Sequence, residues 1–279
     1  MSGFDADWLA LREPADHRAR NPELLAALQT AFANREAVTV VDLGCGTGSN
    51  LRAVAPHLPP RQHWRLVDHD PALLAVARDR LTAWADRAEP DGGDLRLFKD
   101  RRELLVSFAE IDLAADIEGA LGDRPDLVTA AALFDLVSTS WIKRFVRAVV
   151  SRRAAFYTAL TYDGVETWEP PHAADADMLA AFHAHQGGDK GFGPSAGPGA
   201  NAALEKTFSA LGYEARTGAS PWRLGKQDAA LIGELARGCA QAVRETGQAQ
   251  PGQAASWLDA RLGGAACTVG HIDVLSIPR

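Results

Sequence analysis

Cysteine is scarce in this chain: there are three among 279 residues, and they lie far apart. An odd number without the short spacings of metal sites argues against both a disulfide framework and a structural zinc site. Long apolar runs are missing too, since none reaches the roughly 18 residues that a membrane span needs. The first twenty residues carry acids early and lack the apolar core of a secretion signal. We therefore expect a reduced, cytoplasmic protein with no metal and no membrane partner.

Basic residues are in the minority, with 29 Lys and Arg against 36 Asp and Glu and a net charge of −7. A chain with this balance has no general attraction for nucleic-acid phosphates, so no nucleic-acid partner is expected. The contents of 47% hydrophobic and 23% charged residues are ordinary for a globular protein. A chain of this length forms one large domain or two small ones with a sizeable core.

Strand-like and helix-like segments alternate after two N-terminal helical segments. Short apolar runs rich in β-branched residues predict strands, and the segments between them are typical of amphipathic helices. This alternation favours a doubly wound, mostly parallel α/β sheet with helices on both faces and right-handed crossovers. The predicted strands are 37–44, 63–70, 104–112, 124–135 and 153–162, with 94–100 as a further candidate.

The chain changes character after residue 162, where helices and a loop rich in Gly and Pro follow the alternating part. We divide the sequence into an N-terminal helical cap at 1–36 and an α/β domain at 37–279. This domain includes the segment 163–211 and a helical insertion at about 220–265. The elements expected here are a helix at 175–185, a Gly/Pro loop at 186–199, a helix at 200–211, a strand at 213–220 and a final strand at 267–278.

The stretch "VVDLGCGTGSN" at 40–50 lies at the carboxyl end of the first predicted strand, where doubly wound sheets bind ligands. Gly44, Gly46 and Gly48 form a G-x-G-x-G turn. A dinucleotide fingerprint reads G-x-G-x-x-G, and Ser49 occupies the place of its third glycine. No lysine follows as in a P-loop. Asp42 would repel a pyrophosphate and suits a ligand with a cationic group, such as an α-ammonium.

Two further acids end or follow the next strands. Asp68 ends the second strand, where a carboxylate accepts the hydroxyl groups of a ribose. Asp112 follows the third strand and is placed to accept the exocyclic amine of adenine. An amino-acid end, a ribose and an adenine in one line describe S-adenosylmethionine.

The segments "VVDLGCGTGSN", "LVDHDPALLAVA", "IDL" and "PDLVTAAALFDLV" together resemble successive motifs of class I S-adenosylmethionine-dependent methyltransferases. The resemblance covers roughly residues 38–162 and, more loosely, the final strand. It implies a Rossmann-like sheet of seven strands, the last of them antiparallel. The family usually has a short hairpin where this chain has the insertion at about 220–265. We expect that insertion to serve as a lid or as an oligomer contact, for example in a homodimer.

The resemblance also implies which residues bind the cofactor. The three glycines line the methionine part, with Cys45 as a small spacer that offers its backbone. Backbone carbonyls at Ala130 and its neighbours meet the ammonium, and Arg18 of the N-terminal helix meets the methionine carboxylate. The expected cofactor-binding residues are Asp42, Gly44, Cys45, Gly46, Gly48, Asn50, Asp68, His69, Asp112, Leu113, Ala130 and Arg18.

Several residues are candidates for contacting the methyl acceptor or for catalysis. The segment after the fifth strand should lie over the same sheet edge as the cofactor, although a helix end followed by a glycine loop explains it equally well. His183 and His185 point about 200° apart on a helix, so they do not share a metal. His271 is more typical of a core residue. The candidates are Tyr162, His185 and Asp189 for catalysis, Lys190 as an anion clamp, and Asp163 and Trp168 as acceptor contacts.

We therefore expect a transferase (EC 2.1.1.-) that moves a methyl group from S-adenosylmethionine to a small-molecule acceptor by direct displacement. Transfer to O, N, S or C stays open, because no "NPPY"-like tetrad follows the fourth strand. Two alternatives stay open as well. One is a protein that binds S-adenosylmethionine without transferring its methyl group, and the other is an NAD(P)-linked oxidoreductase.

Overall fold

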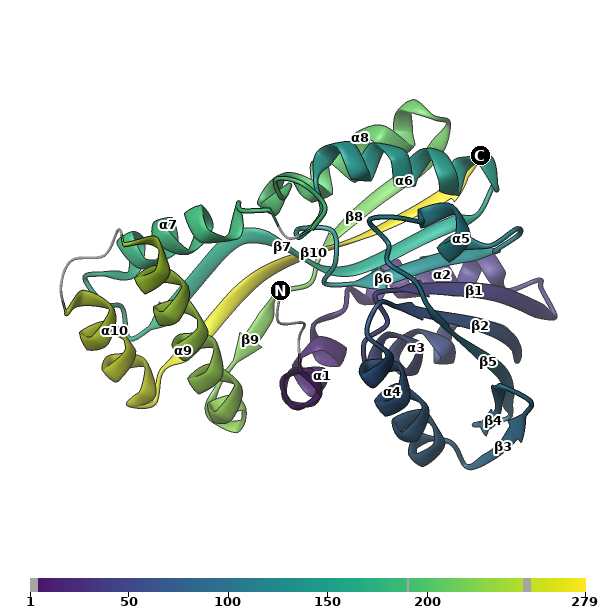
Figure 1. Ribbon diagram of the computed structural model, residues 1–279, viewed down its shortest axis with the longest axis horizontal. Coiled ribbons are helices and arrows are strands. Elements are labelled where there is room, and N and C mark those ends of the chain that lie inside the picture. The colour runs from purple at the N-terminus through teal and green to yellow at the C-terminus, as the bar shows by residue number, and fades with distance from the viewer. Residues whose placement is uncertain (1–4, 190, 248–251) are drawn as a thin grey trace.

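The computed structural model describes residues 5–189, 191–247 and 252–279. One sheet runs through this part of the chain, with helices on both of its faces (Figure 1). The strands pair in the order β3-β4-β5-β2-β1-β6-β7-β10-β8, and β9 pairs with β10 beside this path. Their bounds are β1 Ala37–Leu43, β2 Arg61–Asp68, β3 Arg87–Asp91, β4 Asp94–Lys99, β5 Arg102–Glu110, β6 Leu127–Ala131, β7 Ala155–Glu169, β8 Tyr213–Ala219, β9 Trp222–Leu224 and β10 Ala266–Pro278.

Two helical layers cover the core of the sheet. The helices α2, α3 and α4 pack on one face in a cluster that includes Leu28, and α5, α6 and α8 pack on the other in a cluster that includes Phe145. In β1, Val40 belongs to the first cluster and Val41 to the second, because successive side chains of a strand point to opposite faces. The α-helices are α1 Ala6–Ala19, α2 Pro22–Phe32, α3 Ser49–Val54, α4 Pro71–Trp84, α5 Ile117–Leu121, α6 Thr139–Ser151, α7 Asp175–Gln186, α8 Ala200–Ala210, α9 Ala229–Thr246 and α10 Gln253–Leu262.

The fold class expected from the sequence is confirmed. Strands β5, β2, β1, β6 and β7 are parallel, and the last strand, β10, runs antiparallel to both of its neighbours. The expected number of seven strands was too small, since the described residues contain ten. The seven expected strands form the continuous row from β5 to β8, and β3, β4 and β9 extend it.

The extra strands β3 and β4 form a hairpin on the edge next to β5. Gly92 and Gly93 make its two-residue turn, and Gly92 has a φ of 62°, which favours glycine. Leu95 and Leu97 of β4 are buried, whereas the edge strand β3 is largely exposed and carries Pro90. The strand candidate at 94–100 corresponds to β4, whereas no strand is predicted over the polar residues of β3.

The strands β7 and β10 are long, with 15 and 13 residues, and continue past the core sheet. Their distal halves form a separate lobe with β9, α7, α9 and α10, at the left in Figure 1. The rings of Trp168 and Trp257 meet edge to face at 5.2 Å in this lobe. The guanidinium of Arg261 lies over both rings and pairs with Asp175. The segment 163–211 is thus divided, since α7 joins the inserted helices while α8 packs against α6.

The first helix, α1, lies between β9 and α4 (Figure 1) and is held there by several contacts. Glu13 pairs with Arg52 of α3 through two hydrogen bonds of 2.8 and 2.7 Å. The His17 ring nitrogen Nε2 lies 3.0 Å from the Ser49 hydroxyl. Pro14 lies inside this helix without ending it. These contacts place one face of α1 against the loop that follows β1.

All three cysteines are buried and free. Among the described residues, no helix has the length and apolar character that crossing a membrane requires. The same part of the chain has no group of three or more His, Cys, Asp or Glu side chains arranged to hold a metal ion.

Candidate active site

The glycine loop leaves β1 as a tight turn at the carboxyl edge of the sheet. Gly44, Gly46 and Gly48 have φ values of 61°, 52° and 76°, in the left-handed region that other residues rarely adopt. The Cys45 amide donates to the Val67 carbonyl of β2, and the Gly48 amide donates to the Cys45 carbonyl. The turn therefore presents backbone rather than side chains to the space above the sheet.

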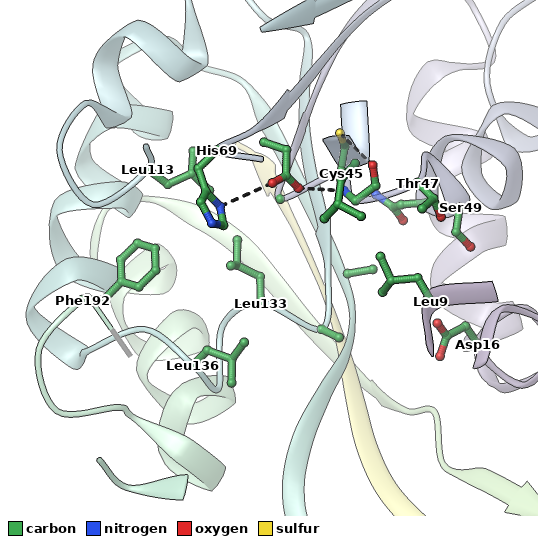
Figure 2. A pocket seen from close by; sticks show the side chains of 18 of the residues that line it. Leu9, Asp16, Cys45, Thr47, Ser49, His69, Leu113, Leu133, Leu136 and Phe192 are labelled. Atoms are coloured by element: carbon green, nitrogen blue, oxygen red, sulfur yellow. Dashed lines mark hydrogen bonds and ion pairs between the residues drawn. The ribbon is translucent and has the colours of Figure 1, made fainter. Parts of the chain in front are cut away.

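A cavity of about 620 Å³ opens above this loop. Figure 2 shows α1 on one side of it, with Leu9 and Asp16, and Leu133, Leu136 and Phe192 on the other. It is lined by Leu9, Arg12, Asp16, Arg20, Gly44, Cys45, Gly46, Thr47, Ser49, Asn50, Asp68, His69, Leu73, Asp112, Leu113, Ala114, Ala131, Ala132, Leu133, Leu136, Asp189, Gly191 and Phe192. The cavity thus joins the glycine loop, the ends of β2, β5 and β6, the helix α1 and the loop after α7.

Asp68 connects the end of β2 to the glycine loop. Its Oδ2 accepts a hydrogen bond of 2.9 Å from the Gly46 amide, and its Oδ1 accepts one of 3.1 Å from the Asp70 amide. The neighbouring His69 is largely exposed, with its Nδ1 3.4 Å from the Asp68 Oδ1. The carboxylate is therefore held in one orientation at the wall of the cavity.

The end of β5 forms the part of the wall where the sequence predicts an adenine contact. The Asp112 Oδ1 accepts a hydrogen bond of 2.8 Å from the Ala114 amide. The Trp141 indole donates one of 3.0 Å to the Leu113 carbonyl. Asp112, Leu113 and Ala114 all line the cavity, so two expected residues lie together at this end.

Asp42 lies beneath the cavity rather than in its wall. It is fully buried, and its Oδ1 accepts a hydrogen bond of 2.7 Å from Asn50, which also donates to Thr129 at 3.1 Å. Its Oδ2 has no partner among the described residues. Burial raises the pKa of this carboxyl to about 7, although the bond from Asn50 opposes that rise. Asn50 is therefore the side chain that meets the cavity here.

Two other residues expected to bind the cofactor, Ala130 and Gly48, also lie outside the cavity wall. Ala130 is fully buried in β6, and the next residues, Ala131 and Ala132, form the wall in its place. Gly48 is the N-cap residue of α3 and lies outside the described lining of the cavity. In both places the cavity wall is formed by residues one or two positions away on the same loop or strand end.

The arginine expected at the methionine carboxylate needs a larger correction. Arg18 is half exposed and pairs with Asp228 at 2.5 Å, outside the described lining of the cavity. Arg20 lines the cavity instead, and its Nε and Nη1 are buried without a hydrogen-bond partner in the described chain. A signal for this existed, because Leu9, Arg12, Asp16 and Arg20 follow the spacing of one helix face whereas Arg18 does not.

The three catalytic candidates lie in different places, and only one of them is in the described cavity wall. The Tyr162 hydroxyl lies 2.9 Å from the His183 Nε2, and burial raises the pKa of this phenol well above its usual value. His185 pairs with Glu245 of α9 at 3.1 Å. Neither residue is in the cavity wall, as far as the described residues show. Asp189 does line it, but its Oδ1 accepts hydrogen bonds from the Gly191 and Gly193 amides.

Other acceptor-side predictions have similar outcomes. Trp168 packs in the lobe against Trp257, and Asp163 accepts a hydrogen bond from the Val165 amide. Lys190 lies outside the described residues. His271 is a buried residue, as its sequence context suggested, and burial lowers its pKa to about 3.

Phe192 of the Gly/Pro loop is a wall residue that the sequence did not indicate. Its ring meets the Trp141 ring edge to face at 5.4 Å, which brings this loop to the end of β5. Leu9, Leu133 and Leu136 were missed as well. An apolar side chain in the sequence does not indicate whether it lines a site or the core. These residues could therefore be assigned to the cavity only from the fold.

A glycine turn between β1 and α3, with a carboxylate at the end of the next parallel strand, defines a Rossmann-like domain with a nucleoside-type cofactor site. Residues 40–123 match the family model for a methyltransferase domain. This part of the chain is thus similar to a methyltransferase domain, in agreement with the resemblance seen in the sequence. S-adenosylmethionine is the cofactor of that family.

The fold also resembles solved structures at low sequence identity. The YcgJ protein from Bacillus subtilis has 13% identity and a TM-score of 0.50, over 93% of this chain and 100% of that chain. A S-adenosylmethionine-dependent methyltransferase from Thiobacillus denitrificans, in complex with S-adenosylhomocysteine, has 16% identity and a TM-score of 0.46, over 100% of both chains. No curated protein sequence matches the chain.

Proposed function

We propose that this protein transfers the methyl group of S-adenosylmethionine to a small-molecule acceptor by direct displacement. The observation that carries the proposal is the single cavity that joins the glycine loop, Asp68 and Asp112 to an apolar region beyond them. The net charge of −7 disfavours a nucleic-acid acceptor. The limited volume of the cavity, with α1 forming one wall, favours a compact molecule.

The residues present fit the cofactor. The unpartnered Nε and Nη1 of Arg20 suit the methionine carboxylate, and the unpartnered Oδ1 of Asn50 suits the ammonium. Asp68 accepts the ribose hydroxyls, and Asp112 lies where the adenine amine would donate. Gly44 and Gly46 let the ligand approach the backbone, because neither has a side chain on the cavity side.

The chain's own contribution to the reaction is alignment and exclusion of water. The bound cofactor supplies a methyl group on a positively charged sulfur, which is already a good leaving group. Leu9, Leu133 and Leu136 form apolar walls that hold an acceptor in line and keep water out. No general base is assigned, since only an acceptor that is protonated at the working pH requires one.

Calorimetry with S-adenosylhomocysteine, followed by transfer of labelled methyl groups to a metabolite extract, tests the proposal. We expect binding of the cofactor product and label in one or a few small molecules. Binding without any labelled product would favour a protein that holds the cofactor for another purpose. A melting temperature raised by NAD(P) but not by S-adenosylhomocysteine would instead indicate an oxidoreductase.

A further inference from the structure

Arg12 occupies the acceptor side of the cavity in an unusually fixed position. It lies on the same face of α1 as Leu9 and Asp16, and its side chain is 11% exposed. The Arg12 Nε donates to the Asp16 Oδ2 at 2.9 Å, and the Arg12 Nη2 donates to the Asp16 Oδ1 at 3.2 Å. This two-point pairing sets the plane of the guanidinium.

Trp222 of β9 fixes the same pair from the other side. The Arg12 guanidinium carbon lies 5.1 Å from the centre of the Trp222 ring. The Trp222 indole donates a hydrogen bond of 3.0 Å to the Asp16 Oδ1. Asp16 therefore uses both of its oxygens inside the protein, and it serves to position Arg12.

One end of the guanidinium remains available. Of its five N–H groups, those on Nε and one on Nη2 bind Asp16. The Arg12 Nη1 makes no hydrogen bond in the described chain, and it retains some accessible surface. Since Arg12 lines the cavity, this end offers a planar pair of donors to whatever occupies the acceptor side.

The charges near Arg12 favour an anion at that end. Asp189 already holds the Gly191 and Gly193 amides with its Oδ1. Asp135 also interacts with Arg12, but burial raises the pKa of this carboxyl to about 6, and its Oδ2 accepts a hydrogen bond from Gln186. The sulfonium of the cofactor would add a positive charge to the same cavity, which disfavours a cationic acceptor. Arginine forks match a carboxylate in two parallel hydrogen bonds.

We propose that the acceptor is an apolar carboxylic acid, whose carboxylate pairs with the free end of Arg12 while its apolar body contacts Leu133, Leu136 and Phe192. This inference rests on the transferase function proposed above. It adds the chemical class of the acceptor and a residue that selects it.

The test uses two probes of one shape, 2-naphthoate and 2-naphthamide, titrated by calorimetry into protein saturated with S-adenosylhomocysteine. The naphthoate should bind at least about tenfold more tightly, because a hydrogen bond to a charged partner contributes more than a neutral one. Arg12→Gln should abolish this preference, and Arg12→Lys should retain part of it, since the charge stays and the fork is lost. Equal affinities of the two probes for the unaltered protein would overturn the inference.

Arg18→Gln is the matched control. It makes the same substitution on the same helix and removes an ion pair, but at a half-exposed position outside the described lining. It should keep the preference for naphthoate, and loss of the preference there would overturn the role of Arg12. Affinity for S-adenosylhomocysteine is measured first in every protein. Its absence in the unaltered protein would contradict the proposed function, whereas its presence with equal probe affinities contradicts only the acceptor class.

Discussion

The side-chain amide of Asn50 donates a hydrogen bond of 2.7 Å to the Oδ1 of Asp42, and Asn50 lies between that carboxyl and the cavity. Asp42 is thereby buried with one unpartnered oxygen. An ionised carboxylate in this position is expensive, so the protein holds a carboxyl that favours its proton. The Asp42 carboxyl fixes Asn50 and the start of α3. Because it is buried, the stability of the protein depends on pH.

The pH dependence of stability should change in Asp42→Asn. Burial raises the pKa of Asp42 to about 7, so between roughly pH 4 and pH 7 the unfolded chain loses this proton while the folded chain keeps it. The free energy of unfolding of the unaltered protein therefore falls as pH rises through that window. The variant lacks this fall, and its stability relative to the unaltered protein should rise by up to about 4 kcal/mol. Urea denaturation at several pH values measures the effect.

Asp79→Asn is the control for that experiment, because Asp79 is exposed on α4. Its stability should follow the pH profile of the unaltered protein. If Asp42→Asn also follows that profile, the raised pKa is wrong.

Gly46→Ala should destabilise the protein by about 1–2 kcal/mol, because Gly46 has a φ of 52° that an L-residue adopts with strain. The added methyl carbon would also lie 3.0 Å from the Leu9 Cδ1 of α1. Gly238→Ala is the opposite case, since Gly238 lies in α9 with open space around its Cα and should gain about 0.5–1 kcal/mol. Chemical denaturation of both variants compares them. Equal effects would mean that the loop does not require glycine.

The parts of the fold that the sequence predicted are those set by local patterns. The first strand could be predicted from its β-branched run before Gly44. Asp68 could be predicted as a site residue because it ends the next short apolar strand. The start of α2 also has a local signal, Asn21 followed by Pro22, and Asn21 accepts hydrogen bonds from the Glu23 and Leu24 amides. Such signals depend on a few neighbouring residues.

The parts that were missed depend on contacts between distant segments. Helical spacing separates Arg20 from Arg18, but it does not show which face of α1 packs on the glycine loop. The Glu13–Arg52 pair holds α1 in the observed orientation. The sequence also did not indicate that Phe192 lies beside Trp141, 51 positions earlier. No local pattern encodes these distances, so the acceptor side was the least predictable part of the site.

Asp68→Asn should weaken binding of S-adenosylhomocysteine at least about tenfold, because the charged acceptor for the ribose hydroxyls is lost. The amide also replaces an oxygen that accepts from the Gly46 or Asp70 amide, so the loop itself is perturbed. Calorimetry measures the affinity, and Asp79→Asn again provides the exposed control. Unchanged affinity in Asp68→Asn would contradict the assignment of this carboxylate to the ribose.

Arg20→Gln should weaken binding of S-adenosylhomocysteine about tenfold or more, because the unpartnered Nε and Nη1 of Arg20 are assigned to the carboxylate of the amino-acid end. The compound 5′-methylthioadenosine has the same adenine and ribose but lacks that end, so its affinity should stay within about twofold. Arg18→Gln, two residues earlier in the last turn of α1, should leave both affinities unchanged. Calorimetry with the two ligands separates a carboxylate contact from a general loss of the site, since an equal loss for both ligands would mean that Arg20 supports the fold of the cavity rather than the methionine end.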